Sequence, residues 1–79
     1  MKHDVILEVF RNDIEALSRC TPQGRQSAMK VSARLVAEAF GDDLGYACEW
    51  FRSVSAELVP YEDGTGCYVV TCQSSAQSA

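Results

Sequence analysis

The sequence is poor in the residues that catalysis usually requires. It contains one histidine, His3, placed near the amino end of the chain. A general base must lie within hydrogen-bond reach of the proton that it removes, and residues near a chain end are seldom held that firmly. Gly64 and Gly66 are followed by neither a helix nor a lysine, so a phosphate-binding loop is not expected. These absences predict a binding protein that is not an enzyme and uses no cofactor.

The chain also lacks a long apolar stretch. No part of it approaches the roughly 20 consecutive apolar residues that a membrane-spanning helix needs. The first ten residues include two acidic side chains, Asp4 and Glu8, which a secretory signal does not carry. We therefore expect a cytoplasmic protein that does not engage a membrane.

The four cysteines show no metal-binding pattern. Structural zinc sites use pairs of ligands about two to four residues apart. The closest pair here, Cys67 and Cys72, is separated by an odd number of positions, which places the two on opposite faces of a strand. Cys20 and Cys48 are isolated from both. In a reducing compartment we expect free thiols and no bound metal.

Residues 3–20 fit an amphipathic helix. The apolar stripe consists of Leu7, Phe10, Ile14 and Leu17, which recur at helical spacing. Glu15 precedes Arg19 by four positions, which is a favourable ion pair on a helix. An alternative stays open, because residues 4–10 are also rich in strand formers. In that case they would join the sheet, and a shorter helix would begin near residue 13.

Two further helices are predicted in the middle of the chain. Thr21 is a favourable N-cap and Pro22 suits a first helical position, which together predict a helix over residues 22–40. Gly41 can end that helix in a conformation with positive φ. Asp42 or Asp43 is expected to cap a third, shorter helix that reaches about residue 54.

The pattern changes to that of strands after Ala56. Residues 57–61 and 67–72 are short runs of strand formers, and the Asp63-Gly64 pair between them indicates a hairpin turn. The predicted fold class is α+β, with two to three helices packed on a small antiparallel sheet that contains a C-terminal β-hairpin. We expect residues 1–72 to form one compact domain and the polar residues 73–79 to form a flexible tail.

Charge is unevenly distributed along the chain. Residues 1–34 carry six basic and four acidic side chains, whereas residues 35–79 carry one basic and seven acidic side chains. Acidic side chains can serve solubility alone. They can also meet a basic partner, which speeds association and fixes orientation, with an aromatic residue as the anchor. The predicted partner-binding residues are Glu38, Asp42, Asp43, Glu49, Trp50, Glu57, Glu62 and Asp63.

The expected partner is a protein with a basic surface, and we expect the chain to be a monomer or a weak homodimer. The formal net charge of −4 argues against direct binding of nucleic acid, which needs clustered lysine and arginine. Two alternatives stay open: an adaptor or oligomeric subunit without inhibitory role, and a regulator with a helix-turn-helix within residues 4–40. The roles of the tryptophan and the three tyrosines, in the core or at an interface, also stay open: Tyr46, Trp50, Tyr61 and Tyr68.

Seven acidic residues of the second half form a set that we compare with known small proteins. The set consists of Glu38, Asp42, Asp43, Glu49, Glu57, Glu62 and Asp63. In its size, acidity and compact α+β character, the chain resembles the anti-CRISPR proteins of phages and mobile elements. The resemblance implies a stoichiometric inhibitor that docks on the basic, nucleic-acid-binding surface of a CRISPR effector complex in the host cytoplasm. It transfers no site residues, because anti-CRISPR families differ from one another in fold.

Overall fold

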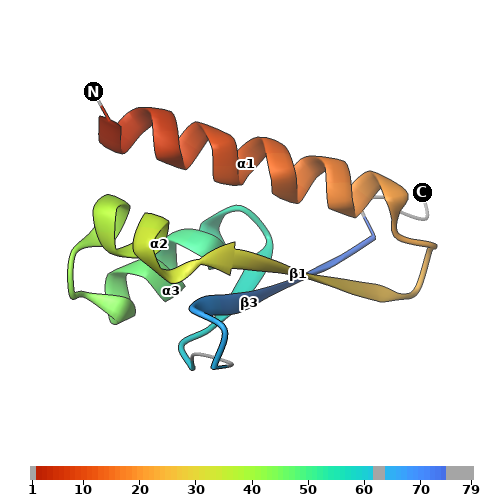
Figure 1. Cartoon of the computed structure of the whole chain (residues 1–79). Coiled ribbons are helices and arrows are strands. Elements are labelled where there is room, and N and C mark those ends of the chain that lie inside the picture. Colours follow the sequence, from red (N-terminus) through yellow and green to blue (C-terminus); the bar gives the residue numbers. More distant parts are fainter. Residues whose placement is uncertain (1, 62–63, 75–79) are drawn as a thin grey trace.

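Three helices and a three-stranded antiparallel sheet make up the fold. The computed structural model describes residues 2–61 and 64–74 of the 79-residue chain. The elements follow the order α1 (Lys2–Cys20), β1 (Gln26–Ser32), α2 (Ala33–Phe40), α3 (Leu44–Ser53), β2 (Ala56–Val59) and β3 (Cys67–Gln73). Figure 1 shows α1 running along the sheet, with α2 and α3 grouped toward the amino end of α1. The predicted α+β class is confirmed.

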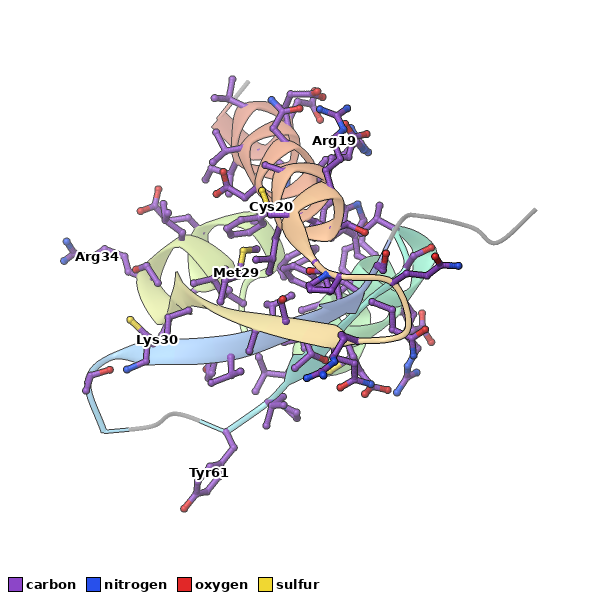
Figure 2. All side chains as sticks on the ribbon, turned by 90° about the vertical axis from the view of Figure 1, so that its right-hand side faces the viewer. Arg19, Cys20, Met29, Lys30, Arg34 and Tyr61 are labelled. Atoms are coloured by element: carbon purple, nitrogen blue, oxygen red, sulfur yellow. The ribbon has the colours of Figure 1, made fainter. Side chains whose placement is uncertain are left out.

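The sheet has β3 at its centre, in the order β1-β3-β2. Val70 pairs with Met29 on one side and with Leu58 on the other, so the three side chains form a row across the sheet. Val70 and Leu58 are buried in the core. In Figure 2, Met29 points toward α1 while its neighbour Lys30 points to the opposite side of the sheet. One face of the sheet therefore packs against the helices, as the alternation of strand side chains requires.

Aromatic rings fill the space between the helices. The ring of Phe51 on α3 lies 5.5 Å from that of Phe10 on α1 and 6.2 Å from that of Phe40 on α2, measured between centroids. Ile14 is also buried, so the apolar stripe predicted for the first helix does face the core. Burial of these large side chains is the main source of favourable free energy in so small a domain.

The predicted helix over residues 22–40 is wrong in its first part. Residues 26–32 form β1, and α2 begins only at Ala33. The hydroxyl of Ser32, and not that of Thr21, caps this helix by accepting hydrogen bonds from the backbone N–H groups of Arg34 and Leu35. Thr21 is buried instead, and its hydroxyl donates to the Leu17 carbonyl at the end of α1, with a donor–acceptor distance of 2.7 Å.

β1 is the strand that completes the sheet beside the β2–β3 hairpin, and residues 4–10 are helical. The hairpin of β2 and β3 needed another partner, because two strands alone are marginal in water. The alternative prediction gave that place to residues 4–10, which lie within α1. β1 pairs with β3 along its whole length, from Gln26 with Gln73 to Ser32 with Cys67.

The third helix and the C-terminal hairpin agree with the prediction at the level of elements. α3 begins after Asp43 and ends at Ser53, and β2 and β3 form the predicted antiparallel pair. The predicted flexible tail over residues 73–79 is wrong at its first residue, because Gln73 ends β3 and pairs with Gln26 of β1. The backbone N–H of Ser74 donates to the carbonyl of Arg25 at 3.3 Å. Residues 75–79 of the predicted tail lie outside the described residues.

Candidate partner-binding surface

The second and third helices are joined by a turn of three residues, Gly41, Asp42 and Asp43. Gly41 has a φ of 67°, which favours glycine, and its N–H donates to the Ala37 carbonyl to end α2. The Asp43 carboxylate accepts a hydrogen bond of 2.9 Å from the Tyr46 N–H and so caps α3. We call α2, this turn and α3 together the α2–α3 motif.

Four of the predicted acidic residues lie on this motif. Glu38 is exposed on α2, Asp42 and Asp43 are exposed in the turn, and Glu49 is exposed on α3. We call these four residues the acidic surface. Two arginines share the motif: Arg34, which projects from the molecule in Figure 2, and Arg52 near the end of α3.

The other predicted site residues are not on the motif or are not described. Glu57 is exposed on β2, where it pairs with Thr71 of β3. Glu62 and Asp63 lie outside the described residues. The sequence prediction therefore combined residues from two separate parts of the fold.

Trp50 is held mainly by the core. Its ring lies 5.0 Å from that of Phe51, 5.8 Å from that of Phe40 and 6.3 Å from that of Phe10. The guanidinium carbon of Arg11 lies 5.8 Å from the centre of the indole, which is within range for a cation–π contact. Trp50 thus anchors α3 to α1, and its half-buried ring leaves only part of its surface for a partner.

Tyr46 is the aromatic residue that the acidic surface presents. It is 48% exposed, and its ring packs edge-on against Phe40 with centroids 5.4 Å apart. Tyr61 is 76% exposed beyond the end of β2, and Figure 2 shows it projecting away from the molecule. Tyr68 is half-buried against the core.

Ion pairing distinguishes the acidic surface from the first helix. Between described residues, the ion pairs are Glu8 with Arg11 at 3.0 Å and Glu15 with Arg19 at 3.6 Å, both on α1. The second of these pairs was predicted from its spacing. Within the described part of the chain, the carboxylates of the acidic surface have no cation within ion-pair distance. These negative charges are therefore available to an outside partner.

A small hollow lies beside the turn between α2 and α3. Its volume is about 140 Å³, and it is lined by Ala33, Val36, Ala37, Gly41, Asp42, Leu44 and Tyr68. Asp42 is the one charged residue of this lining, and most of the others are apolar. The volume is well below the roughly 300 Å³ of ordinary small-molecule sites, and it suits a single inserted side chain. Sequence reasoning missed this hollow, because Tyr68 reaches it from β3.

The four cysteines differ in their exposure to solvent. All four cysteines are free, with Cys20 exposed and Cys72 buried. Burial raises the pKa of the Cys72 thiol above its ordinary value of 9.0. Among the residues that the structure describes, no group of three or more histidine, cysteine or acidic side chains could hold a metal ion.

Comparisons with protein-family models, with curated proteins and with solved structures found no match for this chain. Within the described ranges, no helix combines the length and the apolar character that crossing a membrane requires.

Proposed function

We propose that the protein binds a protein partner through the acidic surface, and that a lysine or arginine of the partner enters the hollow beside Asp42. The observation that supports this is the composition of the hollow, which joins apolar walls to one carboxylate. Lysine and arginine have long apolar stems and a charged tip, so their two halves match the two parts of the lining. Tyr46, in the first turn of α3, supplies exposed aromatic area of the kind that contributes most to interface affinity.

More specifically, we propose that the protein is a stoichiometric inhibitor of the anti-CRISPR type. A surface that holds nucleic acid is rich in lysine and arginine, and it attracts a fixed array of carboxylates for the same reason that it attracts phosphates. The acids of the α2–α3 motif are carried by helices and a capped turn, so little conformational freedom is lost on docking. The protein would then compete with nucleic acid for the same surface of the effector complex.

Charge reversal at Asp42 tests the proposal against a matched control. Asp13 is also an exposed acid, and it lies on α1 away from the hollow. D42K and D13K therefore change the net charge equally. The partner is first isolated from host lysate with the wild-type protein and purified, and its affinity for each variant is then measured at low and high salt.

We expect D42K to weaken binding by at least about tenfold, or about 1.4 kcal/mol, while D13K stays close to wild type. Affinity should fall with added salt. Equal losses for the two variants would show that only net charge matters and would contradict the role of the hollow. Displacement of nucleic acid from the purified partner then tests the inhibitory step separately.

A second candidate function is a nucleic-acid-binding regulator. The observation in its favour is the topology: a helix-turn-helix over α2 and α3 is followed by the β2–β3 hairpin, with β1 on the far side of β3, the element order of winged helix-turn-helix domains. The helix-turn-helix predicted from the sequence was a different one, within residues 4–40. The strand β1 interrupts that range.

Charge weighs against this second function. The second helix of such a motif meets DNA with its N-terminal residues, and here Asp42 and Asp43 directly precede the first residue of α3, Leu44. Fluorescence anisotropy with labelled duplex DNA separates the two functions. Binding that weakens steeply with salt would favour the regulator, whereas its absence at high protein concentration favours the protein-binding function.

A further inference from the structure

A second and larger cavity lies where β3 extends beyond β2. Its volume is about 450 Å³, within the range of small-molecule sites. It is lined by Ser18, Gln26, Ser55, Ala56, Glu57, Thr71, Cys72, Gln73 and Ser74. Figure 1 shows the start of β1 and the end of β3 at the carboxyl end of α1, away from the turn between α2 and α3. This cavity is therefore separate from the acidic surface.

The lining offers oxygen atoms and side-chain amides but no positive charge. Four of its residues carry hydroxyls and two carry amides, and Glu57 is its one charged residue. The Ser18 hydroxyl donates a 2.6 Å hydrogen bond to the Gln73 carbonyl, which ties α1 to the end of β3. Glu57 has no cation within ion-pair distance among the described residues. An anionic ligand would find no counter-charge in this lining.

Two helices end beside the cavity. α1 ends at Cys20, two residues after Ser18, and α3 ends at Ser53, two residues before Ser55. The carboxyl end of a helix carries a partial negative charge from its aligned peptide dipoles. Both ends therefore add to the negative potential that Glu57 creates.

The arginines near these helix ends do not line the cavity. Arg19 lies in the last turn of α1, pairs with Glu15 and lines a neighbouring hollow. Arg52 lies in the last turn of α3 and is absent from the lining. Arg25, whose carbonyl accepts a hydrogen bond from the Ser74 N–H, lies next to the lining residue Gln26 in sequence. These three arginines reduce the negative potential around the cavity, but none of them is part of its lining.

The backbone at Ser55 is unusual. Its φ is 64°, and it is the one described residue other than glycine with a positive φ. Such a conformation costs free energy when the residue has a Cβ, and glycine is the usual choice at this position after a helix. The Ser55 hydroxyl also makes no hydrogen bond within the described part of the chain. The Ser55 N–H donates to the Arg52 carbonyl, so this conformation also ends α3. Strained backbone conformations cluster at binding sites.

We propose that this cavity binds a small organic ammonium ion. The Glu57 carboxylate pairs with the positive nitrogen, and hydroxyl and carbonyl oxygens of the lining accept its N–H hydrogen bonds. A divalent metal ion is disfavoured, because such ions prefer several carboxylates and the cavity lining holds one. The site is independent of the partner-binding function, since it shares no residue with the acidic surface.

Titration with putrescine, followed by amide resonances in nuclear magnetic resonance spectra, tests the site. We expect saturable shifts at Ser18, Ser55, Thr71 and Gln73, with a Kd of about 1–10 mM, as expected for a ligand of so few atoms. Two compounds of the same chain length serve as controls: 1,4-butanediol, which is neutral, and succinate, which is negative. Equal shifts with either compound, or none with putrescine, would overturn the proposal.

E57Q identifies the residue that provides the selectivity. We expect it to weaken putrescine binding by about tenfold and to leave the affinity for 1,4-butanediol unchanged. E49Q removes the same charge from the exposed face of α3 and should bind putrescine as the wild type does. Both side chains are exposed, so the spectra without ligand should show an intact fold. Equal losses in the two variants would show a general effect of net charge and reject the site.

Discussion

The Asp43 carboxylate accepts a hydrogen bond from the backbone N–H of Tyr46, with a donor–acceptor distance of 2.9 Å. The same residue thus starts α3 and contributes to the acidic surface. Its substitution therefore tests stability and binding together, unless the two roles are separated. Among the described residues, the Asp42 carboxylate accepts no hydrogen bond, so Asp42 is the better position for a charge reversal.

Two substitutions at Asp43 separate its roles. D43A removes the cap and should lower the free energy of unfolding by about 1 kcal/mol, whereas D43N keeps a capping oxygen and should lose only a few tenths. For a domain of this size, 1 kcal/mol corresponds to about 4–8 °C in Tm. Urea unfolding followed by circular dichroism measures both. If D43N proved as unstable as D43A, the carboxylate charge and not the hydrogen bond would be the stabilising feature.

Replacing Ser55 with glycine should stabilise the fold. Glycine removes the strain of a Cβ at positive φ, about 1–2 kcal/mol, and costs about 0.5–1 kcal/mol in chain entropy. We expect a net gain of up to about 1 kcal/mol, seen as a higher Tm. The matched control is S53G in the last turn of α3, which loses a hydrogen bond from the Ser53 hydroxyl to the Trp50 carbonyl and should be destabilised. A lower Tm for S55G would mean that the Ser55 side chain supports the turn.

The raised pKa of Cys72 predicts a loss of stability at alkaline pH. Above pH 9, the thiol loses its proton in the unfolded chain and keeps it in the folded one, because burial disfavours the thiolate. The unfolded state then binds fewer protons, so the free energy of unfolding falls with pH by up to about 1.4 kcal/mol per pH unit. Below pH 8 this contribution should be constant.

Chemical unfolding at several pH values from neutral to alkaline measures this effect. Wild type should lose more stability over the alkaline range than C72A, in which the titrating thiol is absent. C20A should follow the wild type, since Cys20 is exposed. Identical slopes for wild type and C72A would contradict the prediction.

The two halves of the predicted helix over residues 22–40 show where local pattern misleads. Gln26, Ala28, Met29 and Lys30 all tolerate a helix well, and the stripe of Met29, Val36 and Phe40 continues at helical spacing. β1 forms because β3 gains a second partner from it, and because alternate side chains such as Met29 and Val31 then reach the core. The stabilisation from this strand pairing depends on β3, which lies more than thirty residues away in sequence.

The candidate sites divide in the same way. The acids of the turn, the cap at Asp43 and the role of Gly41 follow from local rules of turns and helix ends. The hollow beside Asp42 could not be predicted, because Tyr68 comes from β3. The grouping of Glu57 with Asp42 was an effect of charge counted along the chain, and the fold places them in different cavities.

The sequence by itself determined what depends on neighbours within a few residues: the apolar stripe of the first helix, the approximate bounds of α3, the β2–β3 hairpin, and the excess of acid in the second half. Only the tertiary structure decided that residues 4–10 are helical, that β1 completes the sheet, that Trp50 packs against the core, and which residues line the two cavities. The physical reason is that local preferences amount to fractions of a kcal/mol per residue. Pairing a central strand and burying large side chains contribute several kcal/mol, from groups that the chain brings together only on folding.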